Sequence, residues 1–267
     1  MNYPIKQLSF VRVALLFLGG FGLTLLKIKN PFTRMKTLFR FSCWMLGLGL
    51  LLSFPTFAQL KGTWQQKGDD GIITSLICSD DYLMMTRYKE KEFIYTEGGT
   101  YKITNGTIAY KSEFNSADTS RVGKTLNFKI TISGKKLSVE NVGEWQQMDD
   151  GSTPASALYR ITGRMGNDGN ISPMQRGPRK TLKMLTGTRF QWAAINPETK
   201  QFSGTGGGSY VIKDGKYTET IEFFSRDNSR VGASLTFDYE LKDGKDWHHS
   251  GLSSAGAKIY EVWSKEQ

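Results

Sequence analysis

A short pattern of charged and polar residues occurs twice in this sequence and is its first candidate for binding chemistry. The pattern Asp-x-Ser-Arg-Val-Gly occupies 118–123 and 227–232, and each copy follows a glutamate, Glu113 or Glu222. The guanidinium of Arg121 or Arg230 could hold a carboxylate or a phosphate through two parallel hydrogen bonds. The alternative is structural: the aspartate and serine set a turn, and the arginine pairs with the glutamate or covers a barrel end. Duplication favours the structural alternative, because two copies more readily share a folding requirement than a ligand.

The segment Trp247-His248-His249 contains the only two histidines of the sequence and is the second candidate. Neighbouring residues of a strand point to opposite faces, so both rings cannot bind one metal ion inside a barrel. One of them could still meet a haem or a metal with ligands from other strands. We expect a surface or barrel-end pair, because the sequence lacks the His-x-x-x-His or Cys-x-x-Cys spacing of a metal site. The sequence therefore predicts no metal and no cofactor.

Aromatic residues at alternating positions are the third candidate, because they could line a ligand cavity. Eight short strands enclose either a core filled by side chains or a space for one small ligand. Glu219 stands on the presumed inner face where the first copy has Tyr110. A buried carboxylate needs a partner, so this position indicates a polar cavity or an edge. The predicted ligand-binding residues are Tyr101, Tyr110, Phe114, Arg121, Tyr210, Tyr217, Glu219, Glu222, Arg230 and Trp247.

Catalytic chemistry finds little support. The sequence contains no Gly-x-Ser-x-Gly elbow, and Cys78 has no base beside it along the chain. The run Gly206-Gly207-Gly208 precedes a strand pattern, so it lacks the helix N-terminus that a phosphate cradle needs. We therefore predict a protein that is not an enzyme.

The elements that must position these residues are arranged as an internal repeat. With a shift of 109, residues 93–132 match 202–241 at 17 of 40 positions, where unrelated sequences would match at about three. Apolar residues alternate with polar ones over 125–132 and 234–241, which predicts strands with one buried face. Asn105-Gly106 and Asp214-Gly215 are strong hairpin signals.

These patterns predict an all-β chain in which six to eight short antiparallel strands occur twice. A closed barrel and a sandwich both protect the edge strands. The regular hairpin spacing favours two tandem meander β-barrels. We place module one at 59–163, a linker rich in Gly and Pro at 164–179, and module two at 180–267.

The N-terminal region accounts for most of the positive charge. Residues 1–58 contain seven of the 35 basic residues and no acidic one, which leaves 28 basic and 25 acidic residues and argues against nucleic-acid binding. The pattern over 35–58 is that of a signal peptide cleaved after Ala58, with 1–34 as a mis-called start. The alternative is a membrane-anchored N-terminus, which would be the protein's only membrane contact. Cleavage would remove Cys43 and leave Cys78 alone, without an intrachain disulfide.

Two segments of module two resemble a known family. The stretch 206–223, Gly-Gly-Gly-Ser-Tyr-Val-Ile-Lys-Asp-Gly-Lys-Tyr-Thr-Glu-Thr-Ile-Glu-Phe, and the terminal strand 259–263 are similar to the lipocalin-like domains of uncharacterised secreted proteins from Bacteroidota. The resemblance implies calycin-type β-barrels exported to the periplasm, the cell surface or the medium. Module one has about 16 more residues after Gly62-Thr63-Trp64 than module two has after Gly187-Thr188-Arg189, which predicts an extra hairpin at 72–87.

The functional prediction is a secreted, non-catalytic binding protein. Its tandem barrels would accommodate a small apolar or amphipathic ligand, or a glycan. The alternative is a structural or interaction module that binds an envelope protein through its barrel loops.

Overall fold

The computed structural model describes residues 60–166 and 168–266. The predicted targeting region, its cleavage point and the alternative anchor lie outside these residues. Within the described ranges, no helix has the length and apolarity needed to cross a membrane. The described residues form one compact unit that contains both repeats.

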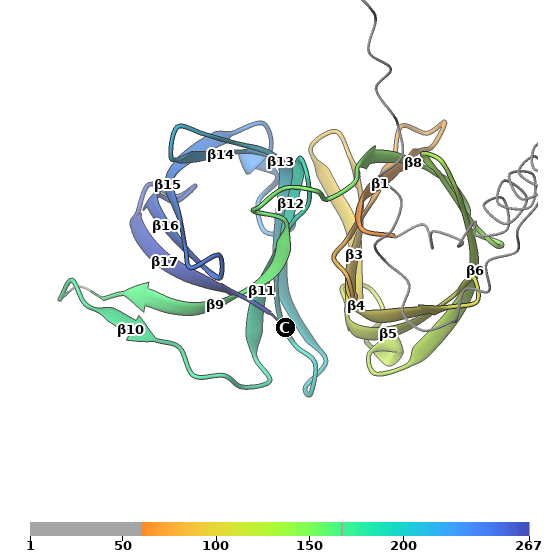
Figure 1. The fold of residues 1–267 in the computed structure, drawn as a ribbon, viewed down its shortest axis with the longest axis horizontal. Coiled ribbons are helices and arrows are strands. Elements are labelled where there is room, and N and C mark those ends of the chain that lie inside the picture. The colour runs from red at the N-terminus through yellow and green to blue at the C-terminus, as the bar shows by residue number, and fades with distance from the viewer. Residues whose placement is uncertain (1–59, 167, 267) are drawn as a thin grey trace, which may run out of the picture. The chain divides into compact units, whose positions relative to one another are not determined.

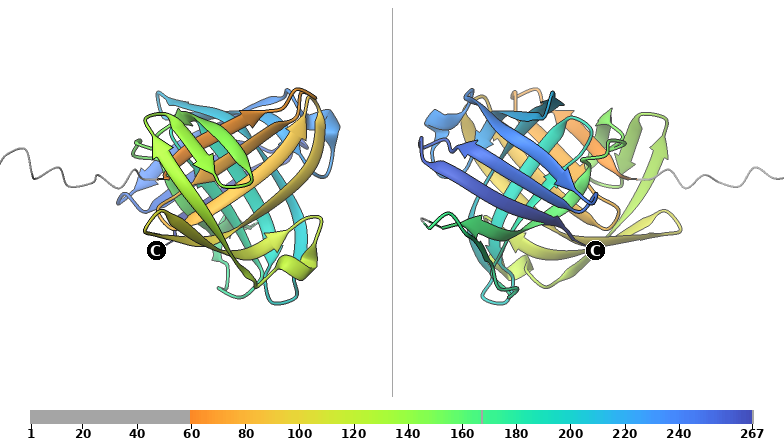
Figure 2. Two further views of the ribbon diagram at one scale, coloured as in Figure 1. Left: turned by 90° about the vertical axis from the view of Figure 1, so that its right-hand side faces the viewer. Right: turned by 60° about the vertical axis from the view of Figure 1, so that its left-hand side comes forward.

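The first repeat, called barrel one here, is a closed barrel of eight antiparallel strands in meander order, with β8 paired back onto β1 (Figure 1). The strands run obliquely around the barrel (Figure 2). Their bounds are β1 Gly62–Lys67, β2 Ile73–Cys78, β3 Tyr82–Lys89, β4 Glu92–Thr104, β5 Thr107–Asn115, β6 Thr125–Ser133, β7 Lys136–Val139 and β8 Gly143–Asp149.

The second repeat, called barrel two here, closes in the same way, through the pairing of β9 with β17. A short strand, β10 (Ile171–Pro173), adds to β9 outside the ring. The other bounds are β9 Ala157–Met165, β11 Lys180–Leu185, β12 Arg189–Asn196, β13 Gln201–Lys213, β14 Lys216–Phe224, β15 Ser234–Lys242, β16 Asp246–Leu252 and β17 Lys258–Lys265. The predicted all-β class and the two tandem eight-stranded antiparallel barrels are confirmed.

The predicted module boundary at residue 163 falls inside β9. This strand pairs with β11 and β17, so it is the first strand of barrel two. The segment 164–179 also contains β10, which pairs with β9. Glycine and proline in this stretch mask a strand pairing that depends on partners far along the chain.

The extra hairpin predicted at 72–87 is not extra. Strands β2 and β3 correspond to β11 and β12, and equivalent hydrogen bonds close their turns: Ser79 N to Tyr82 O, and Thr186 N to Arg189 O. The true counterpart of Trp64 is Tyr159. Each donates from its side chain to the carbonyl four residues earlier. The apparent surplus of residues in module one arose because β9, the first strand of barrel two, begins before the stretch 164–179, which is rich in Gly and Pro and was predicted to be a linker.

The repeated turns and glycines have local structural causes. Asn105 and Asp214 adopt left-handed backbone conformations with φ of 49° and 51°, as the predicted hairpins require. At Gly99 and Gly208, a Cβ atom would lie 2.0 Å from a carbonyl oxygen of the neighbouring strand. These glycines therefore allow β4 and β13 to approach β5 and β14 closely beside a bulge.

Three hydrophobic clusters hold the unit together, one inside each barrel and one between them. In the runs 75–78 and 182–185 every residue is buried, because these strands face a barrel core on one side and the other barrel on the opposite side. The cluster between the barrels is called the seam here. Its buried residues are Ile77, Tyr82, Met84, Phe114, Leu158, Leu182, Met184, Ala193 and Ile195.

Candidate functional site

The repeated Asp-x-Ser-Arg-Val-Gly segments form equivalent turns. Each aspartate caps a 3-10 turn, Asp118 before Thr119–Arg121 and Asp227 before Asn228–Arg230, by accepting from a backbone N–H at 2.9 Å. Arg230 Nε lies 3.1 Å from Asp227 Oδ2, and Arg121 Nη2 lies 3.6 Å from Glu97 Oε2. These contacts fit the structural alternative, although the partners of the arginines are not Glu113 and Glu222.

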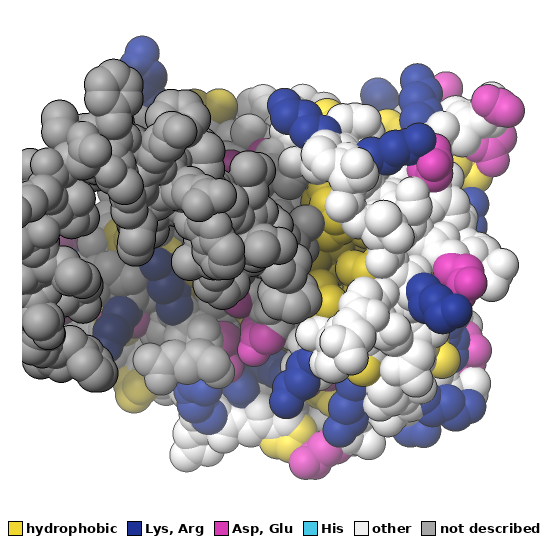
Figure 3. Space-filling view, turned by 45° about the vertical axis from the view of Figure 1, so that its right-hand side comes forward, with side chains coloured by type: hydrophobic (Ala, Val, Ile, Leu, Met, Phe, Trp, Pro, Cys, Tyr) yellow, Lys and Arg dark blue, Asp and Glu magenta, His cyan; other side chains and the backbone are white. Residues whose placement is uncertain are grey.

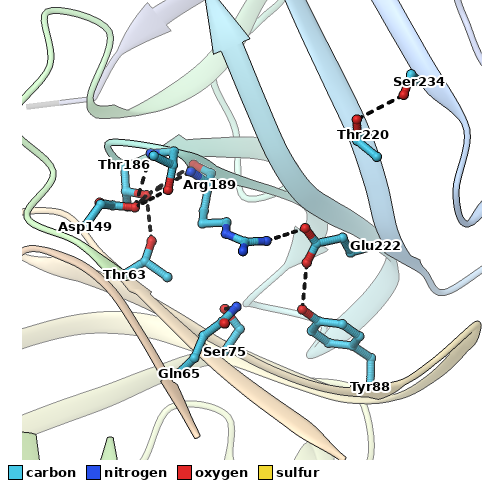
Figure 4. Close-up of polar contacts among 11 residues, drawn as sticks. Thr63, Gln65, Ser75, Tyr88, Asp149, Thr186, Arg189, Thr220, Glu222 and Ser234 are labelled. Carbon is cyan, nitrogen blue, oxygen red and sulfur yellow. Dashed lines mark hydrogen bonds and ion pairs between the residues drawn. The ribbon is translucent and has the colours of Figure 1, made fainter. Parts of the chain in front are cut away.

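Glu113 and Glu222 instead join the two barrels. Glu222 pairs with Arg189 of its own barrel and accepts from the Tyr88 hydroxyl of barrel one at 2.8 Å (Figure 4). Glu113 accepts from the Tyr82 hydroxyl at 2.9 Å and pairs with Lys180 of barrel two at 2.8 Å. Burial, and then the charge of Glu222, raises the pKa of Tyr88, so its hydroxyl stays protonated and donates.

A second polar contact fixes the end of β8 to the turn between β11 and β12. Asp149 accepts from Gly187 N at 2.8 Å and from Thr188 Oγ1 at 2.8 Å. The hydroxyls of Thr63 and Thr186 lie 2.7 Å apart (Figure 4). Together with the seam, these bonds hold the barrels as one body.

The interior of barrel two contains a buried ion pair. Lys183 Nζ lies 2.9 Å from Glu219 Oε2, and the two residues are only 4% and 7% exposed. The ammonium also lies 4.8 to 6.0 Å from the centroids of four aromatic rings, within or at the limit of cation–π range. These rings belong to Phe190, Tyr217, Trp247 and Trp263.

His249 lies beside this pair and is uncharged. Its ring centroid is 4.1 Å from that of Phe237, 4.9 Å from Trp247 and 5.8 Å from Tyr217. Burial, and then the charge of Lys183, lowers the pKa of His249 to about 2. A charged ring would have no counter-charge of its own there, so the folded protein holds neutral imidazole.

Several buried polar atoms of this interior lack a hydrogen-bond partner among the described residues. They are His249 Nδ1, Trp247 Nε1 and the Tyr217 hydroxyl, which lies near Glu219 without hydrogen-bond geometry. Buried polar groups are normally paired. The Trp247 and His249 nitrogens are exceptions to this rule in the barrel-two interior.

Barrel one has different residues at the same positions. The strand registers place Leu76, Tyr110 and Val139 where barrel two has Lys183, Glu219 and His249. Leu76 and Tyr110 are buried in the barrel-one core, and Val139 packs against it. The same fold thus forms with an interior that lacks these three ionisable groups.

A groove of about 490 Å³ opens at one end of barrel two. Ile259 lines this groove and also packs against the barrel-two core. Gly251, another lining residue, follows His249 by two positions on β16. Tyr260 accepts from or donates to His248 Nδ1 at 2.7 Å. The full lining is Met165, Gly166, Ser250, Gly251, Leu252, Lys258, Ile259 and Tyr260.

The structure distributes the predicted ligand-binding residues over several places. Tyr210, Tyr217, Glu219 and Trp247 belong to the barrel-two interior, whereas Tyr101 and Tyr110 belong to that of barrel one. Phe114 packs in the seam. Arg121, Arg230 and Glu222 form the turn and inter-barrel contacts described above.

Two important residues were not among the predicted set. Lys183 interrupts an apolar run, and alignment with Leu76 would have placed it on the inner face. The expectation of a surface or barrel-end histidine pair is wrong for His249, which is 3% exposed inside the barrel. Since adjacent strand residues face opposite ways, one histidine of the pair had to point inward once β16 formed part of the barrel wall.

The described ranges contain no group of three or more His, Cys, Asp or Glu residues placed to hold a metal ion. Comparison of the sequence with protein-family models gave no match, and comparison with curated proteins gave none either. The functional argument therefore depends on the site itself.

We expect His249 to make the protein less stable in mild acid. An unfolded chain binds a proton at this histidine below about pH 6.5, whereas the folded protein does not until about pH 2. This contribution to stability is therefore intact above pH 6.5 and declines as the pH falls towards 2. Between pH 7 and pH 5, denaturant titrations should show a loss of about 2 kcal/mol from this group.

The matched control is His249→Val, which copies Val139 of barrel one. This variant should lose most of the pH dependence between pH 7 and pH 5. If it retains the same slope as the wild type, His249 is not the group responsible.

Proposed function

We propose that this protein binds a small apolar or amphipathic molecule at the open end of barrel two and does not act as an enzyme. The groove carries the proposal. Its volume of about 490 Å³ lies within the range typical of small-molecule sites. Ile259 belongs to both its lining and the edge of the barrel core, so a ligand in the groove would contact the interior.

Half-exposed apolar side chains inside both barrels support this proposal. Leu126, Phe128, Ile130 and Ile132 of β6 pack against the barrel-one core but stay partly accessible. Leu235, Tyr239 and Leu241 do the same on β15. On the face that Figure 3 shows, where barrel one comes forward, apolar side chains gather in a recess, and charges of both signs are interspersed around it. Such surfaces favour an uncharged or amphipathic ligand.

We also propose that the two barrels are lipocalin-like domains of an exported protein. The support is the barrel architecture together with the sequence features of 1–58. The destination would be the periplasm, the cell surface or the medium.

The test combines native mass spectrometry of protein from the producing cell with titration of phenylnaphthylamine, a neutral apolar fluorophore. We expect a small-molecule adduct in the spectrum and saturable fluorophore binding. Ile259→Trp should fill the groove and weaken binding at least tenfold, which corresponds to about 1.4 kcal/mol. Val211→Trp, at a residue 63% exposed on β13, is the matched control and should bind normally.

The second candidate function is binding of an envelope protein. The β9–β10 hairpin extends from the wall of barrel two (Figure 1) and exposes Met165, Ile171 and Met174. A native spectrum that shows a stoichiometric protein partner, with no small-molecule adduct and no fluorophore binding, would favour this candidate over the first.

A further inference from the structure

The turn between β2 and β3 and the turn between β11 and β12 occupy equivalent places in the two barrels and have the same hydrogen bonds. Ser79 and Thr186 each donate their backbone N–H to the carbonyl three residues later. Their own carbonyls accept from a tyrosine hydroxyl, that of Tyr101 at 2.7 Å and that of Tyr210 at 2.6 Å. The backbone of the two turns is therefore held in the same way.

The turn in barrel two binds a carboxylate through its backbone. The side chain of Asp149, at the end of β8, accepts from Gly187 N at 2.8 Å and from Thr188 N at 3.1 Å. Neighbouring backbone N–H groups of a turn commonly form such anion-binding sites. Because the turn in barrel one has the same backbone hydrogen bonds, it has the same capacity.

The turn in barrel one does not receive the corresponding carboxylate. Glu266 is the counterpart of Asp149, because each stands at the end of the strand that closes its barrel. The carboxylate of Glu266 instead pairs with Arg176, with Nη2 and Oε1 3.0 Å apart. Asp81 is equivalent to Thr188, and its backbone N–H has no acceptor among the described residues.

A pocket of about 260 Å³ lies beside this turn, between the two barrels. Ser79 and Asp81 line it from barrel one, and Leu158, Lys265 and Glu266 line it from barrel two. Sites for drug-sized ligands have volumes of about 300 Å³ or more. This pocket is slightly smaller, so it has room for a molecule of the size of an amino acid.

The charged side chains that line the pocket leave one charge of each sign available. Lys61 Nζ lies 3.3 Å from Asp80 Oδ1, and Glu266 is paired as described above. The carboxylate of Asp81 has no partner among the described residues. The ammonium of Lys265 has only a backbone carbonyl there, at 3.4 Å. The pocket therefore presents one anion and one cation to a ligand.

We propose that this pocket binds a small zwitterion of the amino-acid class. The ligand carboxylate accepts from the backbone N–H of Asp81 and from the Lys265 ammonium, as the carboxylate of Asp149 accepts from the equivalent turn. The ligand ammonium pairs with the Asp81 carboxylate. None of the residues that line this pocket lines the groove of barrel two, so the inference does not depend on the proposed function.

The test begins with thermal denaturation of the wild-type protein in the presence of each common amino acid. We expect at least one of them to raise the Tm, because a ligand between Asp81 and Lys265 joins the two barrels and binds only the folded protein. The amino acid with the largest effect is then titrated by calorimetry at pH 7.5.

The same titration is made with two analogues of that amino acid, one without the ammonium and one without the carboxylate. For leucine these are 4-methylpentanoate and 3-methylbutylamine. We expect the zwitterion to bind at least tenfold more tightly than either analogue, because each analogue lacks one charge-assisted hydrogen bond.

Two variants separate the two charges of the site. Asp81→Asn should weaken binding of the zwitterion at least tenfold and leave the carboxylate analogue unaffected, whereas Lys265→Met should weaken the zwitterion and leave the amine analogue unaffected. Asp214→Asn and Lys213→Met are the matched controls. They make the same charge changes at exposed residues outside the pocket and should bind as the wild type does.

Three outcomes would overturn the inference: no amino acid raises the Tm, either analogue binds as tightly as the zwitterion, or the control variants weaken binding as much as the pocket variants. If a variant fails to fold, the wild-type comparison of zwitterion and analogues decides the question. Titration of phenylnaphthylamine tests the barrel-two groove separately, so failure of the inference and failure of the proposed function are distinguishable.

Discussion

Replacing Glu219 with leucine is expected to lower the free energy of unfolding by about 3–5 kcal/mol, because the variant leaves Lys183 buried and unpaired. The aromatic rings around the ammonium cannot replace the lost carboxylate charge, since cation–π contacts contribute only about 0.5–2 kcal/mol each. Denaturant titration near neutral pH, followed by tryptophan fluorescence, measures the loss.

The internal repeat supplies the control for this prediction. The double variant Lys183→Leu/Glu219→Tyr copies Leu76 and Tyr110 of barrel one and removes both charges. We expect it to unfold within about 1 kcal/mol of the wild type or to be more stable. If Glu219→Leu lowers the free energy of unfolding no more than this double variant does, the charges of Lys183 and Glu219 are not buried as a pair.

The second large effect is expected at the seam between the barrels. Phe114 is 1% exposed and its ring centroid lies 6.2 Å from that of Phe202 of barrel two. Phe114→Ala should lower the free energy of unfolding by about 3–5 kcal/mol, because it leaves a cavity in a packed cluster. The matched control is Val211→Ala on the exposed surface, which should change stability by less than about 0.5 kcal/mol.

The seam also predicts how the barrels unfold. Because nine buried residues from both barrels form one cluster, the wild type should lose both barrels in a single cooperative transition. Calorimetry of wild type and Phe114→Ala tests this expectation. Two separate transitions in the wild type would show that the seam contributes little to stability.

Local sequence signals determined much of the fold. The alternation of apolar and polar residues specifies which face of a strand is buried, and turns such as Asn105-Gly106 specify where the chain reverses. Both signals act between neighbours in the chain, so they could be predicted without tertiary information. The repeat then extended the prediction from one module to two. Part of the site was also predictable, because Glu219 on an inner face required a partner.

The tertiary structure decided the features that depend on distant partners. Strand β9 closes barrel two against β17, about a hundred residues away, and composition near β9 favoured a linker instead. The seam depends on the outer faces of strands in different barrels. Lys183, Glu219 and His249 meet because closure brings β11, β14 and β16 around one axis. Spacing along the chain does not encode that meeting, since strand register and barrel closure are non-local.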